Sequence, residues 1–241
     1  MYEYVDAHVH ASELSEEEIK RIFKKREIII LSVAEDIPSS LKNIHLSTIY
    51  ENFIPAVGIH PCKVDNYNED NIKTIEKIIS ENNIKILGEI GLDKRFCKNF
   101  EKQKIFFEKF LKIAKDYDLS VNLHALDSWR EVFDLLIKYD IKKAYFHWYN
   151  GPFDLLEEIQ NVGYFIGINL AIKIQDKHKE ILEKANIENI LTESDGPYEY
   201  RGLFLHPEGI GELYQIISQV KGIDIYRLSY QIKRNLSKFV I

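Results

Sequence analysis

The sequence is poor in cysteine and has no long apolar run. Cys62 and Cys97 are its 2 cysteines, far apart and outside any Cys-x-x-Cys pattern, so we expect no disulfide framework and a reducing compartment. No stretch approaches the roughly 18 consecutive apolar residues of a membrane-spanning helix. No basic segment followed by an apolar run opens the chain, so no signal peptide is expected. These absences predict a soluble, cytoplasmic protein with no membrane partner, in which both cysteines are bystanders.

The sequence also lacks an excess of basic residues. Its 32 Lys and Arg against 38 Asp and Glu give a net charge of -6. This balance argues against a protein that holds nucleic acid mainly through a broad basic surface. It does not exclude a nuclease, because bound divalent ions supply local positive charge that the count omits.

Short β-branched apolar runs alternate with amphipathic helical segments along the whole chain of 241 residues. Strands are predicted at residues 4–10, 27–33, 53–58, 84–89, 119–123, 143–146, 164–168 and 189–192. Helices are predicted at residues 13–25, 39–50, 70–82, 99–118, 128–139, 153–161 and 177–185, with two further helices at 208–220 and 224–239.

This strand–helix repeat predicts an α/β fold with a parallel sheet. Eight units in this length favour a closed (β/α)8 TIM barrel, a single domain over residues 1–241 with extra C-terminal helices. An open doubly wound sheet would more often carry a glycine-rich loop after its first strand. Here the first strand instead ends in His8-Val9-His10.

Polar and titratable residues cluster where the predicted strands end. Because strand side chains alternate, Asp6, His8 and His10 lie on one face of the first strand. Later strand ends supply His60, Glu89, His124, His147 and Asp195. A barrel gathers these ends on one face, where active sites of this fold lie, so we expect the side chains to converge.

The expected metal ligands are four histidines and two carboxylates, too many for one tetrahedral site. They are His8, His10, His124, His147, Glu89 and Asp195. The set suits two adjacent ions with one carboxylate bridging, and such a pair can activate a water and stabilise attacking and leaving oxygens. Nitrogen-rich ligation favours Zn, Mn, Fe or Co, with Mg possible. Asp195 can accept a proton from the nucleophilic water, and Glu89 shares the catalytic role.

Other residues are candidates for lining the substrate. His60 precedes Pro61 and either caps a turn or lines the site, with lining favoured. Trp148 is expected in the pocket wall. Lys94 and Arg95 are either surface charges or contacts to an anionic substrate, and Arg201 is the one basic residue in its loop.

Four further polar residues have a structural interpretation. Glu193 is a substrate-lining candidate, interpreted as either a residue behind the ligands or a helix-cap partner. Asp6 is expected behind the ligands, orienting an imidazole. His178, like His45, is interpreted as a helix-surface residue.

Taken in order, the strand-end motifs resemble those of the TatD family of metal-dependent hydrolases, within the amidohydrolase-like barrels. The matching segments include Asp6-Ala7-His8-Val9-His10, Gly58-Ile59-His60-Pro61, Gly88-Glu89-Ile90-Gly91-Leu92-Asp93 and Thr192-Glu193-Ser194-Asp195-Gly196-Pro197-Tyr198. The resemblance implies that His8, His10 and Asp195 hold one metal, that Glu89 bridges, and that His124 and His147 hold the other. It also implies phosphodiester hydrolysis of DNA.

The sequence departs from the family around the substrate. Leu126 stands where an Arg is common, and Trp148-Tyr149-Asn150-Gly151 replaces a Cys-Phe-Ser-Gly. The loop after the eighth strand keeps Arg201 and is otherwise apolar. The missing basic residues would be expected to meet phosphates. An aromatic, apolar rim can stack on a base or admit a substrate that is not a nucleic acid.

Three hypotheses follow. The first is a metal-dependent hydrolase of ester bonds, a phosphodiesterase or deoxyribonuclease acting on DNA or a small phosphodiester. The second is an amidohydrolase-type enzyme that cleaves a C–N or ester bond in a small molecule or aminoacyl adduct. The third is a degenerate barrel that only binds, which would lack ligands, whereas this sequence has all six. The sequence makes no prediction of oligomeric state.

Overall fold

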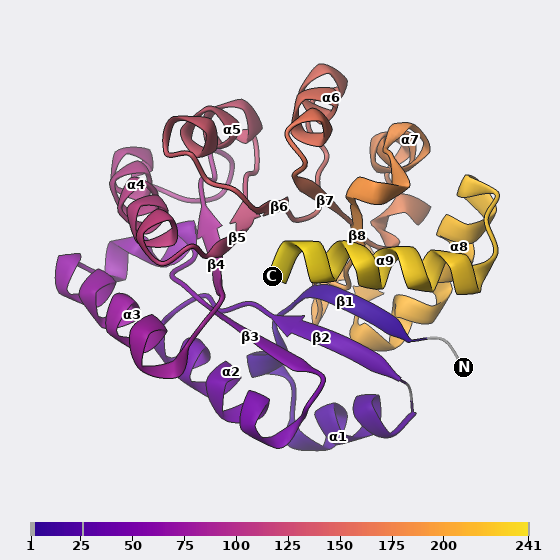
Figure 1. Ribbon diagram of the computed structural model, residues 1–241, viewed down its shortest axis with the longest axis horizontal. Helices are drawn as coiled ribbons and strands as arrows, with labels where there is room; N and C mark the ends of the chain where they lie inside the picture. Colours follow the sequence, from indigo (N-terminus) through magenta and orange to yellow (C-terminus); the bar gives the residue numbers. More distant parts are fainter. Residues whose placement is uncertain (1–2, 26, 241) are drawn as a thin grey trace.

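A computed structural model describes residues 3–25 and 27–240, and its centre is one sheet of eight strands (Figure 1). The strands are β1 (Tyr4–Val9), β2 (Ile28–Ser32), β3 (Phe53–Val57), β4 (Ile86–Gly91), β5 (Ser120–His124), β6 (Ala144–Phe146), β7 (Phe165–Ile168) and β8 (Ile190–Thr192). Each pairs in parallel with its neighbour in chain order.

The two ends of the sheet meet just beyond β8. The Asp195 N–H donates to the His8 carbonyl at 2.9 Å, and the His10 N–H donates to the Gly196 carbonyl at 2.8 Å. These bonds make the sheet a nearly closed barrel. The predicted (β/α)8 fold is therefore confirmed, and the described residues agree with the predicted order of elements.

Helices alternate with the strands and surround the barrel (Figure 1). They are α1 (Glu16–Lys25), α2 (Ile37–Ile49), α3 (Glu69–Asn82), α4 (Phe100–Asp116), α5 (Trp129–Lys138), α6 (Phe153–Asn161) and α7 (Asp176–Lys184), followed by α8 (Ile210–Lys221) and α9 (Ile225–Val240). Each amphipathic helix turns its apolar side to the strands. In α4, for example, Phe106, Phe107 and Phe110 are buried.

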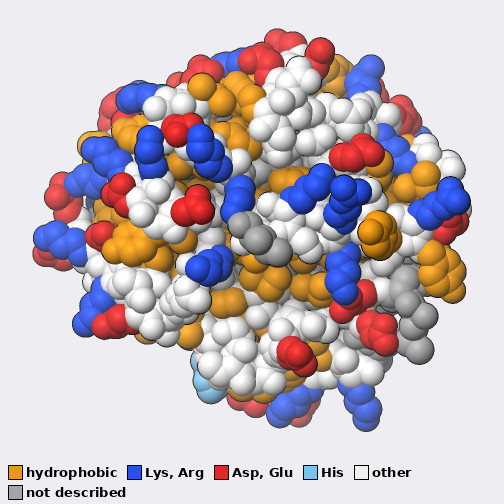
Figure 2. All heavy atoms as spheres, in the orientation of Figure 1, with side chains coloured by type: hydrophobic (Ala, Val, Ile, Leu, Met, Phe, Trp, Pro, Cys, Tyr) orange, Lys and Arg blue, Asp and Glu red, His pale blue; other side chains and the backbone are white. Residues whose placement is uncertain are grey.

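The last helix, α9, covers the end of the barrel where the strands begin (Figure 1). Asn235 Nδ2 donates to the Ile187 and Ile190 carbonyls, each at 2.8 Å, and Ser229 Oγ donates to the Glu3 carbonyl at 2.6 Å. The outer surface on this side carries interspersed acidic and basic side chains (Figure 2). The strand ends that carry the predicted site residues lie at the opposite end.

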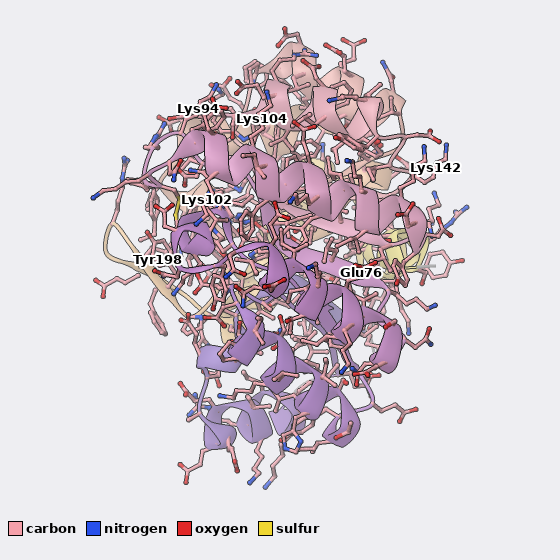
Figure 3. The ribbon with its side chains drawn as sticks, turned by 90° about the vertical axis from the view of Figure 1, so that its left-hand side faces the viewer. Glu76, Lys94, Lys102, Lys104, Lys142 and Tyr198 are labelled. Carbon is pink, nitrogen blue, oxygen red and sulfur yellow. A yellow bond between two sulfur atoms is a disulfide. The ribbon has the colours of Figure 1, made fainter. Side chains whose placement is uncertain are left out.

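A short hairpin after β8 was not among the predicted elements. Strands β9 (Tyr198–Tyr200) and β10 (Leu203–Leu205) pair antiparallel. Arg201 and Gly202 form the turn, with φ of 50° and 82°. Two central residues with positive φ are typical of a tight hairpin turn, so the Arg-Gly pair was its local signal. Figure 3 places Tyr198 of this hairpin at the end of the barrel away from Lys142, which precedes β6.

The structure corrects two predictions about buried and paired residues. Cys62 and Cys97 form a disulfide, with Cα atoms 4.7 Å apart, so they are not unpaired bystanders. They follow the adjacent strands β3 and β4, which brings them together although 35 positions separate them. His178 is fully buried instead of lying on the helix surface. It lies on the side of α7 that faces the barrel wall, where the Tyr149 carbonyl is 3.1 Å from Nδ1.

The single-domain prediction for residues 1–241 stays a prediction, and residues 1–2, 26 and 241 lie outside the described part of the chain. Within residues 3–25 and 27–240, no helix combines the length and the apolar character needed to cross a membrane.

Candidate metal centre

Four ligand atoms, from β1 and the residue after it, from β4 and from the segment after β8, surround one point. His8 Nε2 lies 3.5 Å from Glu89 Oε2 and 3.4 Å from Asp195 Oδ1. His10 Nε2 lies 3.6 Å and 3.5 Å from the same two oxygens. Ligands about 2.1 Å from a tetrahedral ion would be roughly 3.4 Å from one another. The spacing therefore fits a first divalent ion.

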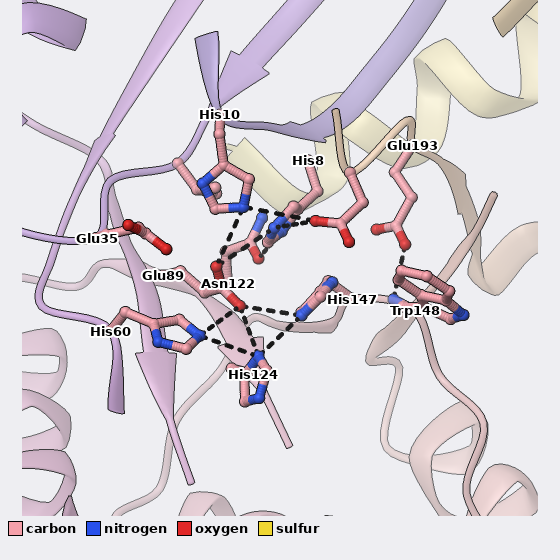
Figure 4. A network of polar contacts seen from close by, with 12 residues as sticks. His8, His10, Glu35, His60, Glu89, Asn122, His124, His147, Trp148 and Glu193 are labelled. Atoms are coloured by element: carbon pink, nitrogen blue, oxygen red, sulfur yellow. Dashed lines mark hydrogen bonds and ion pairs between the residues drawn. The ribbon is translucent and has the colours of Figure 1, made fainter. Parts of the chain in front are cut away.

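A second group of ligand atoms gathers around the other oxygen of Glu89 (Figure 4). Glu89 Oε1 lies 2.9 Å from His124 Nδ1 and 3.0 Å from His147 Nε2. Glu89 itself is 2% exposed and stands between the two groups. One of its oxygens faces each group, as a bridging carboxylate requires.

Hydrogen bonds behind the ligands fix which ring nitrogens present a lone pair. Asn122 Oδ1 lies 2.8 Å from His8 Nδ1, and Asp93 Oδ2 lies 2.8 Å from His124 Nε2. These acceptors assign the proton to the bonded nitrogen and leave His8 Nε2 and His124 Nδ1 free to bind metal. His8 Nε2 is buried with no hydrogen-bond partner among the described residues, as expected for a nitrogen that binds a metal ion.

The sequence reasoning did not find Asn122 or Asp93. Asn122 lies two residues before His124 on β5, and Asp93 ends the segment that begins with Gly88-Glu89. Asp6, expected to orient an imidazole, instead accepts a bond from the Ser194 N–H at 2.8 Å. Asn122 makes the contact to His8 that had been expected of Asp6.

His60 faces the same cavity with a different chemistry. Its Nδ1 accepts the Cys62 N–H at 3.1 Å, so the ring proton resides on Nε2. That Nε2 lies 3.5 Å from Glu89 Oε1 and 3.2 Å from His124 Nδ1. His60 therefore presents a hydrogen-bond donor to the site, which agrees with a lining role better than with a ligand role.

The two ligand carboxylates are ionised in this setting. Burial raises the pKa of Glu89, but its electrostatic interactions with the surrounding imidazoles outweigh burial and hold that pKa well below its usual value. Burial also raises the pKa of Asp195, yet the proximity of His10, His8 and His147 lowers it overall. Metal binding needs deprotonated carboxylates, so the electrostatics match the ligand geometry.

Glu193 lies behind the site wall and not on its surface. The side chain is fully buried, and Oε1 accepts the Trp148 N–H at 2.7 Å and Asn169 Nδ2 at 3.1 Å. Oε2 accepts the Tyr145 hydroxyl. Burial raises the pKa of Glu193 to about 8. Of the two interpretations, a residue behind the ligands agrees with these contacts, and a helix cap does not.

Two hollows open over the ligand atoms. The smaller, about 200 Å³, is lined by His10, Glu35, His60 and Glu89 among others, and Glu35 was not predicted. The larger, about 590 Å³, has Arg95, Trp148 and Arg201 in its lining. Both hollows share His124, His147, Asp195 and Tyr198.

The predicted basic residues divide between the cleft and the surface. Arg95 lines the larger hollow but is paired with Asp127, its Nε 2.7 Å from Oδ2. Lys94 does not line either hollow and forms a salt bridge with Glu131. Arg201 lies over the Tyr200 ring at 5.2 Å.

The chain is similar in sequence and in fold to known metal-dependent hydrolases of one family. A family model described as TatD related DNase matches residues 5–240. An uncharacterized metal-dependent hydrolase of Methanocaldococcus jannaschii is 29% identical over 98% of this chain and 96% of its own length. A human protein named as a deoxyribonuclease is 25% identical over 92% of this chain and 88% of its own. A solved structure of YjjV, a TatD homologue from Escherichia coli, superposes with a TM-score of 0.89 at 21% identity, covering 98% of this chain and 97% of that one.

Proposed function

Because the chain belongs to the TatD related DNase family, we propose that it is a divalent-metal-dependent phosphodiesterase acting on DNA or a small phosphodiester. The observation that carries the proposal is the pair of ligand groups that share Glu89. The name of the human relative, a deoxyribonuclease, supports the phosphodiester substrate.

The ligand residues would hold two ions, according to their positions around Glu89. His8, His10 and Asp195 would hold one ion, His124 and His147 would hold the other, and Glu89 would bridge. When bound, Zn, Mn, Fe or Co, or less readily Mg, would stabilise negative charge on a phosphoryl oxygen and make a nearby water more acidic.

Two side chains are placed to move or donate a proton. Asp195 Oδ1 lies beside His8 Nε2 in the first group of ligand atoms, and its pKa is lowered. The ionised carboxylate can accept a proton from the attacking water. His60 directs Nε2–H into the smaller hollow and can donate a hydrogen bond to a phosphate oxygen. Asn122 and Asp93 would hold the rings of His8 and His124 in the orientation that metal binding requires.

A second candidate function keeps the ligands and changes the bond that is cleaved. The larger hollow is lined by Leu126 and several aromatic rings. Its lining cations are Arg95, Lys177 and Arg201, and Arg95 is already paired with Asp127. This lining favours hydrolysis of a C–N or ester bond in a small molecule, as in amidohydrolase-type enzymes.

A hydrolase assay separates the two. Protein purified without chelator is loaded with Mn, Zn or Mg and given single-stranded DNA, a dinucleotide, and a panel of carboxylic esters and amides. We expect release of nucleotides, abolished by Asp195→Asn and retained by Asp134→Asn, which changes an exposed carboxylate on α5. Cleavage of amides or carboxylic esters with no phosphodiester hydrolysis would favour the second candidate.

A further inference from the structure

Three aromatic side chains form one side of the larger hollow, and we call Trp148, Tyr198 and Tyr200 the aromatic wall. The Trp148 ring centroid lies 5.0 Å from that of Tyr200 and 6.3 Å from that of Tyr198, both edge to face. Tyr198 is 49% exposed, so part of its ring is open to a ligand. Trp148 follows the predicted ligand His147 directly, and Figure 4 shows Trp148 beside His147 at the candidate metal centre.

Hydrogen bonds hold the aromatic wall in place. Trp148 Nε1 donates to Gln175 Oε1 at 3.0 Å, and Gln175 Nε2 donates to the Tyr200 hydroxyl at 2.6 Å. The Trp148 backbone has a φ of 40°, and its N–H is bound by the buried Glu193. A non-glycine residue in this region is costly unless its surroundings fix it, so the position of the ring is built into the fold.

The hollow beside the aromatic wall runs into the metal centre. Its volume of about 590 Å³ is that of a site for one small ligand. His124, His147 and Asp195 belong both to its lining and to the ligand groups. A molecule with its reacting group at the metals would therefore place an adjoining group against the aromatic wall.

We propose that the aromatic wall is a subsite for a single unpaired nucleobase next to the phosphodiester that is cleaved. This inference rests on the proposed function and names the feature that selects its substrate. Flat heteroaromatic rings stack on Trp and Tyr in a way that tolerates any base. A base inside a duplex already has neighbours on both faces and must leave the stack to enter.

Dinucleotides with and without a base test the proposal in the reaction. The metal-loaded protein is given thymidylyl-thymidine and the two analogues in which either the 5′ or the 3′ base is replaced by hydrogen. Removal of one of the two bases should lower kcat/KM about 5- to 150-fold, the range given by roughly 1–3 kcal/mol of stacking. Trp148→Ala should lower kcat/KM for the intact dinucleotide by a similar factor, with no effect on the sensitive abasic analogue.

One variant on the β9–β10 hairpin and one at Trp148 provide the controls. Phe204→Ala removes an aromatic ring from β10 that is 61% exposed and does not line the hollow, so it should leave every rate unchanged. Trp148→Phe keeps a ring and should restore most of the preference. Metal content is measured for each variant, because Trp148 adjoins His147.

Binding separates failure of this subsite from failure of the proposed function. Calorimetry compares thymidine 5′-monophosphate with deoxyribose 5-phosphate, and the base should tighten binding to wild type but not to Trp148→Ala. If that holds while no phosphodiester is cleaved, the subsite stands and the proposed function fails. Equal rates for intact and abasic dinucleotides, or equal binding of the two phosphates, would overturn the subsite.

Discussion

The side chain of Asn122 on β5 reaches across the barrel interior to His8 on β1, with 2.8 Å between Oδ1 and Nδ1. Its other atom, Nδ2, donates to the Ala7 carbonyl at 3.1 Å. Both residues are fully buried, so the contact is shielded from water. One amide thus fixes the orientation and the tautomer of a predicted ligand.

Loss of this amide should weaken the ion held by His8 and His10. We expect Asn122→Ala to lower its affinity about 10- to 100-fold, the usual effect of removing a partner behind a metal ligand. Asn122→Asp keeps an acceptor for His8 Nδ1 and should lose less. Titration against a coloured chelator measures both, and equal losses in the two variants would argue against an orienting role.

Glu89 should be the one carboxylate that both ions require. Its oxygens lie 3.5 Å from His8 Nε2 and 2.9 Å from His124 Nδ1, so it faces both ligand groups. Wild type should bind about two transition-metal ions per chain. Glu89→Gln should lose affinity for both, whereas His147→Ala should lose affinity for one. Elemental analysis after gel filtration decides, and retention of both ions by Glu89→Gln would contradict a bridge.

The barrel, and the convergence of the six predicted ligand side chains, were predictable because both depend on local pattern. Apolar runs set the strands, and a polar residue at a strand's C-terminal end must lie on one face of the barrel. Asn122 carried no such signal, because its role depends on β1 facing β5 across the interior. Asp6 shares a strand face with His8, and that proximity suggested a contact which Ser194 makes instead.

The other differences also arise from contacts between distant segments. Cys62 and Cys97 meet because β3 and β4 are adjacent, which separation along the chain does not reveal. His178 occurs in a charged helical segment, yet its ring faces inward and lies within hydrogen-bond distance of the backbone of two neighbouring loops. Composition and periodicity describe each element alone, so they miss such pairs.

The disulfide should stabilise the oxidised protein. It links the short helix after His60, Pro61–Asn66, to the loop after Asp93, across 35 positions. Removal of a disulfide that closes a loop of this length typically lowers the free energy of unfolding of a protein by about 2–4 kcal/mol. Urea unfolding with and without dithiothreitol should show that loss, and the Cys62→Ser, Cys97→Ser double variant should show it without reductant. If dithiothreitol did not change the urea concentration at the midpoint of unfolding, this would contradict a stabilising disulfide.

Acid should destabilise the fold through His178. Its Nε2 lies 3.3 Å from the Asn169 N–H and its Nδ1 3.1 Å from the Tyr149 carbonyl, so the neutral ring satisfies both groups. Burial lowers its pKa from 6.5 to about 4. The neutral form therefore contributes its full stability above pH 6.5, and that contribution is lost as the pH falls towards 4. The total loss is about 3 kcal/mol.

Substitution of the ring isolates this effect from the other histidines. His178→Gln cannot take up the proton, so its free energy of unfolding should fall less steeply between pH 6.5 and 4 than that of wild type. His45→Gln, the same change at an exposed position on α2, is the matched control. Urea unfolding of metal-free protein at several pH values gives the three slopes. A residue changes this slope only if it gains a proton on unfolding. Equal slopes for His178→Gln and wild type between pH 6.5 and 4 would therefore contradict the prediction.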